Sequence, residues 1–154
     1  MILNSCHRVY YNKGARLKFF LKCGALLFIK NTIKIRTGKM HELGIVLHVI
    51  DEVEALAKEN GVQKVTRLTL EIGEVSTVIP SYFTDCFNWA KKKTEYMKDT
   101  ELKIETIEAV SFCEDCGCRY KTTEYAKKCP ECGGANTYLL TGNETNIKDM
   151  EVME

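Results

Sequence analysis

Two cysteine pairs with the same spacing constrain this chain more than any other feature of its sequence. Each pair is a Cys-x-x-Cys-Gly turn, Cys113–Gly117 and Cys129–Gly133, and twelve residues separate the two pairs. A two-residue gap lets both sulfurs of one turn face the same ion. The glycine that follows tolerates a positive φ, so that backbone N–H groups can turn toward the thiolates. The spacing therefore predicts a tetrahedral four-cysteine site, the closed geometry of structural zinc, made by Cys113, Cys116, Cys129 and Cys132.

Two disulfides or free thiols are the alternatives to a zinc site. Five of the eight cysteines lie in Cys113–Cys132, and Cys86 stands alone on an apolar helix stripe, where we expect a small core residue. Clustered pairs in a chain without a convincing export signal are typical of metal ligands in a reducing compartment, so we expect a cytoplasmic protein. Cys118 is an alternative ligand to Cys116, although its Cys-x-Cys spacing fits the turn less well.

Charge is distributed unevenly along the chain. Residues 1–39 contain nine Lys/Arg and no Asp or Glu, which leaves 13 basic and 21 acidic residues in 40–154, a net charge of −8. A phosphate-binding surface needs a basic excess, so nucleic acid is not an expected partner of the body. An acidic body suits a protein that collects cations. No run of 18 or more apolar residues is present, and we expect no membrane span.

The first 39 residues admit three interpretations. As a signal peptide they fit poorly, because Lys22 interrupts the apolar run Phe19–Ile29 and no small-residue cleavage site follows. A membrane-surface helix would use the same Leu and Phe side chains set among lysines. The third interpretation is upstream sequence, translated from a start codon assigned too early. The sharp change of composition at Met40 favours this one, so we expect 1–39 to be a basic extension that is non-native or disordered.

The body alternates helical and strand patterns. Apolar residues at i, i+3, i+4 and i+7 predict a helix, period-two alternation predicts a strand, and Gly142-Asn143 marks a turn. The predicted order is helix 42–59, strand 65–75, helix 81–93, strand 101–113, the cysteine insert, and two strand-like runs in 137–153. This order predicts an α+β fold, with a small mixed β-sheet and two helices on one face. The predicted domains are an α+β domain of residues 40–112 and 133–154, and a zinc-ribbon-like module of residues 113–132.

A Met-His-Glu segment opens the body. Residue 45 is Ile, so the zinc-protease pattern His-Glu-x-x-His is absent, and a histidine at a helix start is commonly solvated or capping. If Met40 is the N-terminus, its amine, the His41 amide nitrogen and the His41 imidazole lie within one residue. Nitrogen donors in a plane suit Ni(II). Glu42 adds an oxygen donor or orients the imidazole.

These features together resemble the HypA/HybF family of hydrogenase-maturation nickel chaperones over residues 40–154. The resemblance rests on the Met40-His41-Glu42 opening, the segment Ile72-Gly73-Glu74, the two cysteine turns and the Gly142-Asn143-Glu144 tail. It implies delivery of Ni(II) to the precursor of a [NiFe]-hydrogenase large subunit, with a nickel-handling GTPase as partner. Some members also supply urease, which implies urease maturation factors as further partners. The principal nickel ligand implied is His41, with Glu42 beside it and zinc on the four cysteines.

Two departures from the family pattern bear on the nickel site. The 39 extra residues, if retained, convert the Met40 amine into an amide, and the loop Thr77–Pro80 lacks the acidic residue that joins the nickel in some members. We expect a metal carrier and not an enzyme, because zinc held by four thiolates has no open position and the phosphate loop GxxxxGK[ST] is absent. The alternative is a zinc-ribbon module that binds protein or nucleic acid without nickel transfer.

Overall fold

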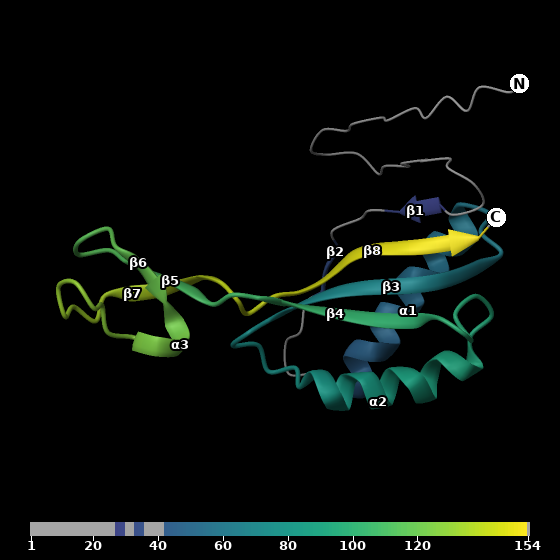
Figure 1. Ribbon diagram of the computed structural model, residues 1–154, viewed down its shortest axis with the longest axis horizontal. Helices are drawn as coiled ribbons and strands as arrows, with labels where there is room; N and C mark the ends of the chain where they lie inside the picture. The colour runs from purple at the N-terminus through teal and green to yellow at the C-terminus, as the bar shows by residue number, and fades with distance from the viewer. Residues whose placement is uncertain (1–26, 30–32, 36–41, 154) are drawn as a thin grey trace, which may run out of the picture.

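The computed structural model describes residues 27–29, 33–35 and 42–153, which form two lobes joined by a narrow waist (Figure 1). The larger lobe contains a mixed β-sheet and two helices, and the smaller lobe contains a separate three-stranded sheet. The small lobe is inserted between two strands of the large one. The predicted α+β class with an inserted cysteine module is confirmed.

The main sheet is built around β3 (Lys64–Gly73). On one side β3 pairs in parallel with β4 (Glu101–Ile107), and on the other it pairs antiparallel with β8 (Thr145–Met153). Two short segments, β1 (Leu27–Ile29) and β2 (Ile33–Ile35), pair antiparallel with the outer edge of β8. Parallel and antiparallel pairings therefore occur in one sheet, as the element order predicts.

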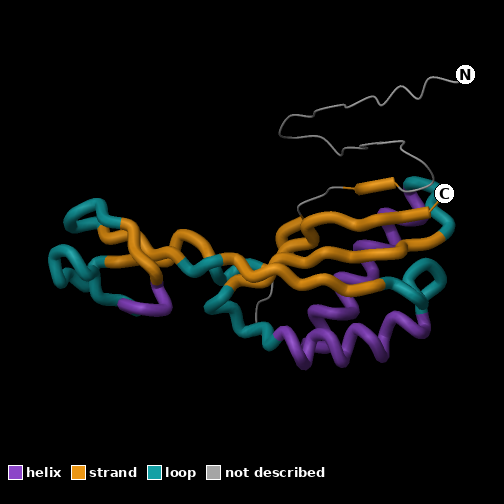
Figure 2. The backbone as a smooth tube through the Cα atoms, viewed as in Figure 1, coloured by secondary structure: helices purple, strands orange, loops and turns teal. Residues whose placement is uncertain are grey.

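Helices α1 (Glu42–Glu59) and α2 (Pro80–Ala90) cover one face of this sheet (Figure 2). The α1 bounds are those that the sequence predicts. The core between helices and sheet is apolar, with Phe83 and Phe87 of α2 fully buried. The predicted helix 81–93 ends earlier and continues as the 3-10 turn η1 (Lys91–Lys93), because the backbone and hydroxyl of Thr94 both donate to the Lys91 carbonyl and tighten the last turn.

The prediction of one continuous strand over 101–113 is wrong. The segment divides into β4 and β5 (Val110–Cys113), which belong to different sheets. The break lies at Ala109, whose N–H donates to the Glu74 carboxylate over 3.1 Å and whose carbonyl accepts from Thr122 over 2.8 Å. The chain therefore exchanges ladder partners at this residue and passes from one lobe into the other.

The waist between the lobes has no room for a side chain at Gly73 or at Gly142. The Gly73 N–H donates to the Glu144 carbonyl over 2.8 Å, and a Cβ at Gly73 would lie 2.1 Å from the Gly142 carbonyl oxygen. Gly142 has a φ of +103° and lies against Ala109. The Glu144 carboxylate accepts from the Gly142 backbone N–H over 2.9 Å. The Ile-Gly-Glu and Gly-Asn-Glu motifs noted in the sequence therefore form the junction of the two lobes.

The small lobe is a three-stranded antiparallel sheet with β5 at its centre. Its neighbours are β6 (Arg119–Lys121) and β7 (Thr137–Thr141), and a one-turn helix α3 (Thr122–Tyr125) follows β6. The two cysteine turns lie just after β5 and just before β7. None of the helices in the described ranges combines the length and apolar composition needed to cross a membrane.

Candidate metal centre

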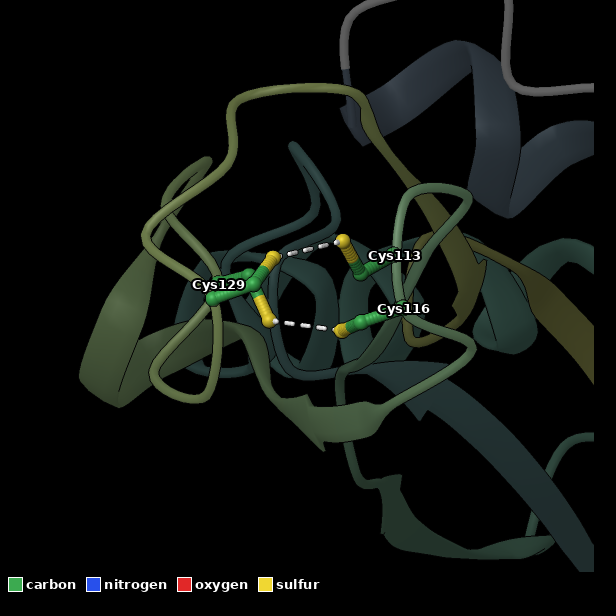
Figure 3. Close-up of side chains that lie close together, drawn as sticks. Cys113, Cys116 and Cys129 are labelled. Atoms are coloured by element: carbon green, nitrogen blue, oxygen red, sulfur yellow. Dashed lines mark hydrogen bonds between the residues drawn. The ribbon is translucent and has the colours of Figure 1, made fainter.

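The two cysteine turns place four sulfur atoms together in the small lobe (Figure 3). The Sγ atoms of Cys113, Cys116, Cys129 and Cys132 all lie within 4.8 Å of one another. Contacts run between the turns, with Cys113 Sγ 3.6 Å from Cys132 Sγ and Cys116 Sγ 3.5 Å from Cys129 Sγ. Both distances exceed the S–S bond length of about 2.05 Å, and all four residues are free cysteines. The disulfide alternative is therefore excluded for these four.

The size of this group fits a tetrahedral metal ion. Zinc–sulfur bonds of about 2.3 Å place the four sulfurs of a tetrahedron about 3.8 Å apart, close to the distances between the turns. Cys113 and Cys129 are buried, whereas Cys116 and Cys132 are exposed, so one side of the group rests on the small lobe and the other faces solvent. Within residues 42–153 this is the one cluster of His, Cys, Asp or Glu whose ligand atoms meet in this way.

The glycines after each pair act partly as the sequence predicts. Gly117 has a φ of +76° and Gly133 a φ of +70°, so the expectation of positive φ is confirmed. Their N–H groups donate to the carbonyls of Cys113 and Cys129, each over 2.9 Å, and close the turns. Backbone N–H groups do face the thiolates, as expected, but they belong to residues other than these two glycines. The residue after Gly133, Gly134, donates its N–H to Cys132 Sγ over 3.4 Å.

The four thiols do not ionise equally. Backbone N–H groups, that of Cys132 first, lower the pKa of Cys129 to about 7. The pKa of Cys116 rises to about 12. The Cys118 amide favours the Cys116 thiolate, but desolvation and contacts with the neighbouring cysteines outweigh it. Adjacent thiols are difficult to ionise together, because their negative charges repel one another. A bound cation offsets this repulsion and deprotonates the thiols that bind it.

Cys118 lies beside the group without joining it. Its Sγ donates to the Arg119 carbonyl over 3.5 Å, and its side chain is half-buried against Cys113, Tyr120 and Cys129. Burial raises the pKa of its thiol. The geometry thus favours Cys116 over Cys118 as the second sulfur of the first turn.

Of the Met-His-Glu segment, the structure describes Glu42 alone. Glu42 is the first residue of α1 and is half-buried, while Met40 and His41 lie outside the described residues. His48, two turns further along α1, is also half-buried. Ile79, which stands directly before α2, is exposed. The predicted nickel ligands therefore remain a prediction.

Comparison with known proteins gives the family of this chain. A family described as "Hydrogenase/urease nickel incorporation, metallochaperone, hypA" matches residues 40–152. The chain belongs to the HypA family. The hydrogenase maturation factor HypA of Geotalea uraniireducens is 34% identical over 113 residues, which cover 73% of this chain and 99% of that protein. The HypA of Chlorobium limicola is 34% identical over 115 residues, covering 75% and 98% of the two chains.

Solved HypA structures share the architecture of the body. The solution structure of the Ni metallochaperone HypA from Helicobacter pylori superposes with a TM-score of 0.59 at 29% sequence identity, covering 74% of this chain and 98% of that one. A second HypA solution structure gives a TM-score of 0.60, also at 29% identity. The similarity spans nearly the whole of each relative, so both lobes belong to the HypA architecture.

Proposed function

We propose that this chain is a nickel chaperone, which binds Ni(II) and delivers it for the maturation of [NiFe]-hydrogenase. The observation that carries the proposal is the match of residues 40–152 to the nickel-incorporation family. The acidic composition of residues 40–154 supports it, because a net negative charge concentrates divalent cations near the protein. Urease is a second destination consistent with the family description.

The proposed nickel ligands are the His41 imidazole, the Glu42 carboxylate and, where Met40 is the N-terminus, its amine. They belong to the α+β domain that the sequence predicts over residues 40–112 and 133–154, although β5 and β7 at its inner boundaries pair within the small lobe. A terminal site with few ligands gives up its ion more readily than a closed cage, as delivery requires. Glu42 supports this placement, since it lies in the first turn of α1, a helix whose buried residues belong to the core.

The proposed occupant of the cysteine group is a structural zinc ion, held by Cys113, Cys116, Cys129 and Cys132 in the module of residues 113–132. Zinc there would supply a cross-link between the two turns, and four thiolates leave it no open position for catalysis. The sulfur–sulfur distances of 3.5 and 3.6 Å between the turns support a single four-coordinate ion. The protein then acts by transferring metal and not as an enzyme.

The proposed partners follow from that role. They are a nickel-handling GTPase, the precursor of the hydrogenase large subunit and, where urease is served, its maturation factors. We expect neither nucleic acid nor a membrane as partner, and we expect the protein to act in the cytoplasm, where cysteine ligands stay reduced.

Titration with Ni(II) tests the proposal. Zinc-loaded protein is titrated calorimetrically in four forms: the full chain, the form beginning at Met40, and that form carrying either His41→Ala or His48→Ala. His48 is the matched control, because it is a half-buried histidine of α1 that lies outside the proposed ligand set. Absorption spectra of the nickel forms report whether the ion is square-planar.

The expected result is one nickel per chain in the Met40 form, lost in His41→Ala and kept in His48→Ala. Weak binding by the full chain would show that residues 1–39 mask the amine donor. Nickel binding that survives His41→Ala would overturn the proposed ligand set. A protein with no nickel affinity in any form would instead be a zinc-stabilised binding module.

A further inference from the structure

Helix α2 has two apolar sides, and the described part of the chain covers only one of them. Phe83, Phe87 and Ala90 are buried in the core of the large lobe. The second side carries Tyr82, Cys86 and Trp89, and the same alternating spacing of three and four residues extends it to Ile79 before the helix and to Lys93 in η1; we call these five residues the α2 stripe. Cys86 is half-buried, but Ile79 is 47% exposed, Tyr82 60% and Trp89 53%.

The spacing and residue types of the α2 stripe are those of a surface that packs against another helix. Alternating steps of three and four residues follow one line along a helix, and two helices pack along such lines. Trp and Tyr are the residues most often responsible for binding energy at protein interfaces. Two exposed aromatic rings, two helical turns apart, therefore provide anchors at both ends of the stripe.

The C-terminal end of the α2 stripe is positively charged. Lys92 and Lys93 follow Trp89 by three and four residues, and the Lys93 Nζ lies 3.8 Å from the centroid of the Trp89 ring. Both lysines are exposed, and neither forms an ion pair with a described residue. Lysine is favourable at a helix C-terminus whatever its function. What distinguishes this pair is the contact of Lys93 with an exposed indole, in a body whose net charge is −8.

We propose that the α2 stripe binds an acidic amphipathic helix of the protein that receives the nickel. This inference rests on the proposed function. A protein that accepts a divalent cation carries anionic ligands, and an acidic surface would be repelled by the rest of this body. The lysines beside Trp89 give such a surface a place to dock, and the aromatic rings then contact its apolar residues. The chain's own residues 1–39 do not fit this role, because they are basic and contain no carboxylate.

The test uses the fluorescence of Trp89, which is the single tryptophan of the chain. The probe is a synthetic helical peptide of repeating Glu-Glu-Leu-Leu, and the same peptide with Gln in place of Glu is its charge control. Proteins titrated are the full zinc-loaded chain, Lys92→Glu/Lys93→Glu, Tyr82→Ala and Lys127→Glu/Lys128→Glu. The last variant is the matched control, an adjacent pair of exposed lysines in the small lobe.

The expected result is a blue shift of Trp89 emission with the acidic peptide, as the indole leaves water. Binding should weaken about tenfold or more in Lys92→Glu/Lys93→Glu and in Tyr82→Ala, and should stay unchanged in Lys127→Glu/Lys128→Glu. Higher salt should weaken binding of the acidic peptide and leave that of the Gln peptide unaffected.

Several results would overturn the inference. One is an unchanged Trp89 emission with the acidic peptide; another is an equal loss of binding in both lysine variants. A blue shift with phosphatidylglycerol vesicles and none with the peptide would assign the stripe to a membrane surface. A concentration-dependent shift without any probe, together with a dimer in sedimentation, would assign it to a second copy of this chain. Nickel titration of the same proteins separates this inference from the proposed function, because the substituted residues lie outside Met40–Glu42.

Discussion

Unequal pKa values within the cysteine group show how the protein prepares a site for a cation. Cys129 has a pKa of about 7 and Cys116 a pKa of about 12, so in the absence of metal only part of the group is ionised near neutral pH. A cation that binds must displace the remaining thiol protons, and its affinity therefore falls as the pH falls. The site is assembled by the fold, but its full charge develops only with the ion.

A single substitution tests which cysteines hold the ion. Cys129→Ser should abolish stoichiometric zinc and unfold the small lobe, because metal binding contributes on the order of 10 kcal/mol to a module of this size. Cys118→Ser should retain one zinc per chain, since its sulfur lies outside the four-sulfur group. Elemental analysis and the circular dichroism of both variants give the answer. Zinc loss in Cys118→Ser would show that Cys118 is a ligand.

The ion pairs on the open face of the main sheet predict a pH effect. Hydrogen bonds from Lys103 and Lys148 lower the pKa of Glu105 from 4.5 to about 2. A carboxylate with a lowered pKa stabilises the fold above its unfolded pKa, and that stabilisation disappears as the pH falls from 4.5 to about 2. Glu105→Gln should therefore melt at a lower temperature than the parent at neutral pH, with a difference that vanishes near pH 2.

The control for this pH effect is Glu95→Gln, which removes the same charge from an exposed residue without an ion pair to a described residue. Thermal melts of the three proteins across this pH range make the comparison. Glu105→Gln and Glu95→Gln with the same pH dependence would refute the role of Glu105.

Residue-scale features were predictable where they depend on neighbours in the sequence. The Cys-x-x-Cys-Gly spacing gives both the sulfur pairs and the positive φ of Gly117 and Gly133. The amide that reaches Cys132 belongs to Gly134, and the sequence has no signal for it. The orientation of Gly134 depends on the folded turn, in which the Cys129 N–H donates to the Gly134 carbonyl.

At the scale of elements, periodicity predicted helix α1 fully and the strands less well. The main error concerned 101–113, which reads as one continuous strand because both halves are rich in β-branched and apolar residues. Only the tertiary contacts of Ala109 divide it. In β3 a register shift between Val65 and Arg67 buries Val65 together with Leu68, although strict alternation places them on opposite faces.

Two aromatic residues of α2 allow a matched test of the helix. Phe87→Ala should destabilise the protein by about 3–5 kcal/mol, because the side chain is fully buried and its removal leaves a cavity. Trp89→Ala, on the same helix but 53% exposed, should change the free energy of unfolding by less than about 1 kcal/mol. Urea denaturation monitored by circular dichroism measures both. A large loss for Trp89→Ala would show that the α2 stripe is already covered within the chain.

At the scale of the whole molecule, the waist determines how the two lobes are held. Gly142 combines a φ of +103° with a Cβ position 2.4 Å from the Ala109 Cα, so Gly142→Ala introduces both strain and a backbone clash. We expect a loss of more than about 2 kcal/mol. Gly61 has a φ of +66° but open space around it, so Gly61→Ala should cost only about 1 kcal/mol. Chemical denaturation of the pair measures the difference, and equal losses would show that the clash is relieved.

The position of the small lobe depends on the strand topology, which the sequence predicts only in part. The insertion is visible in the sequence as cysteine turns between strand patterns. The chain enters the small lobe from β4 and leaves it into β8, and these two strands flank β3. This arrangement depends on pairings between strands that are far apart in the chain. The function of the Ile72-Gly73-Glu74 motif as part of the waist could not be inferred without those pairings.

The waist also has a consequence for how such proteins diversify. The small lobe is entered and left at one place, where Glu74 binds the outgoing chain at Ala109 and Gly73 and Glu144 fasten the returning one. A relative's lobe could be transplanted if it preserves these few junction residues, whatever its own loops contain. Recombination within the family can therefore exchange the cysteine lobe as a unit, with the helical lobe inherited separately.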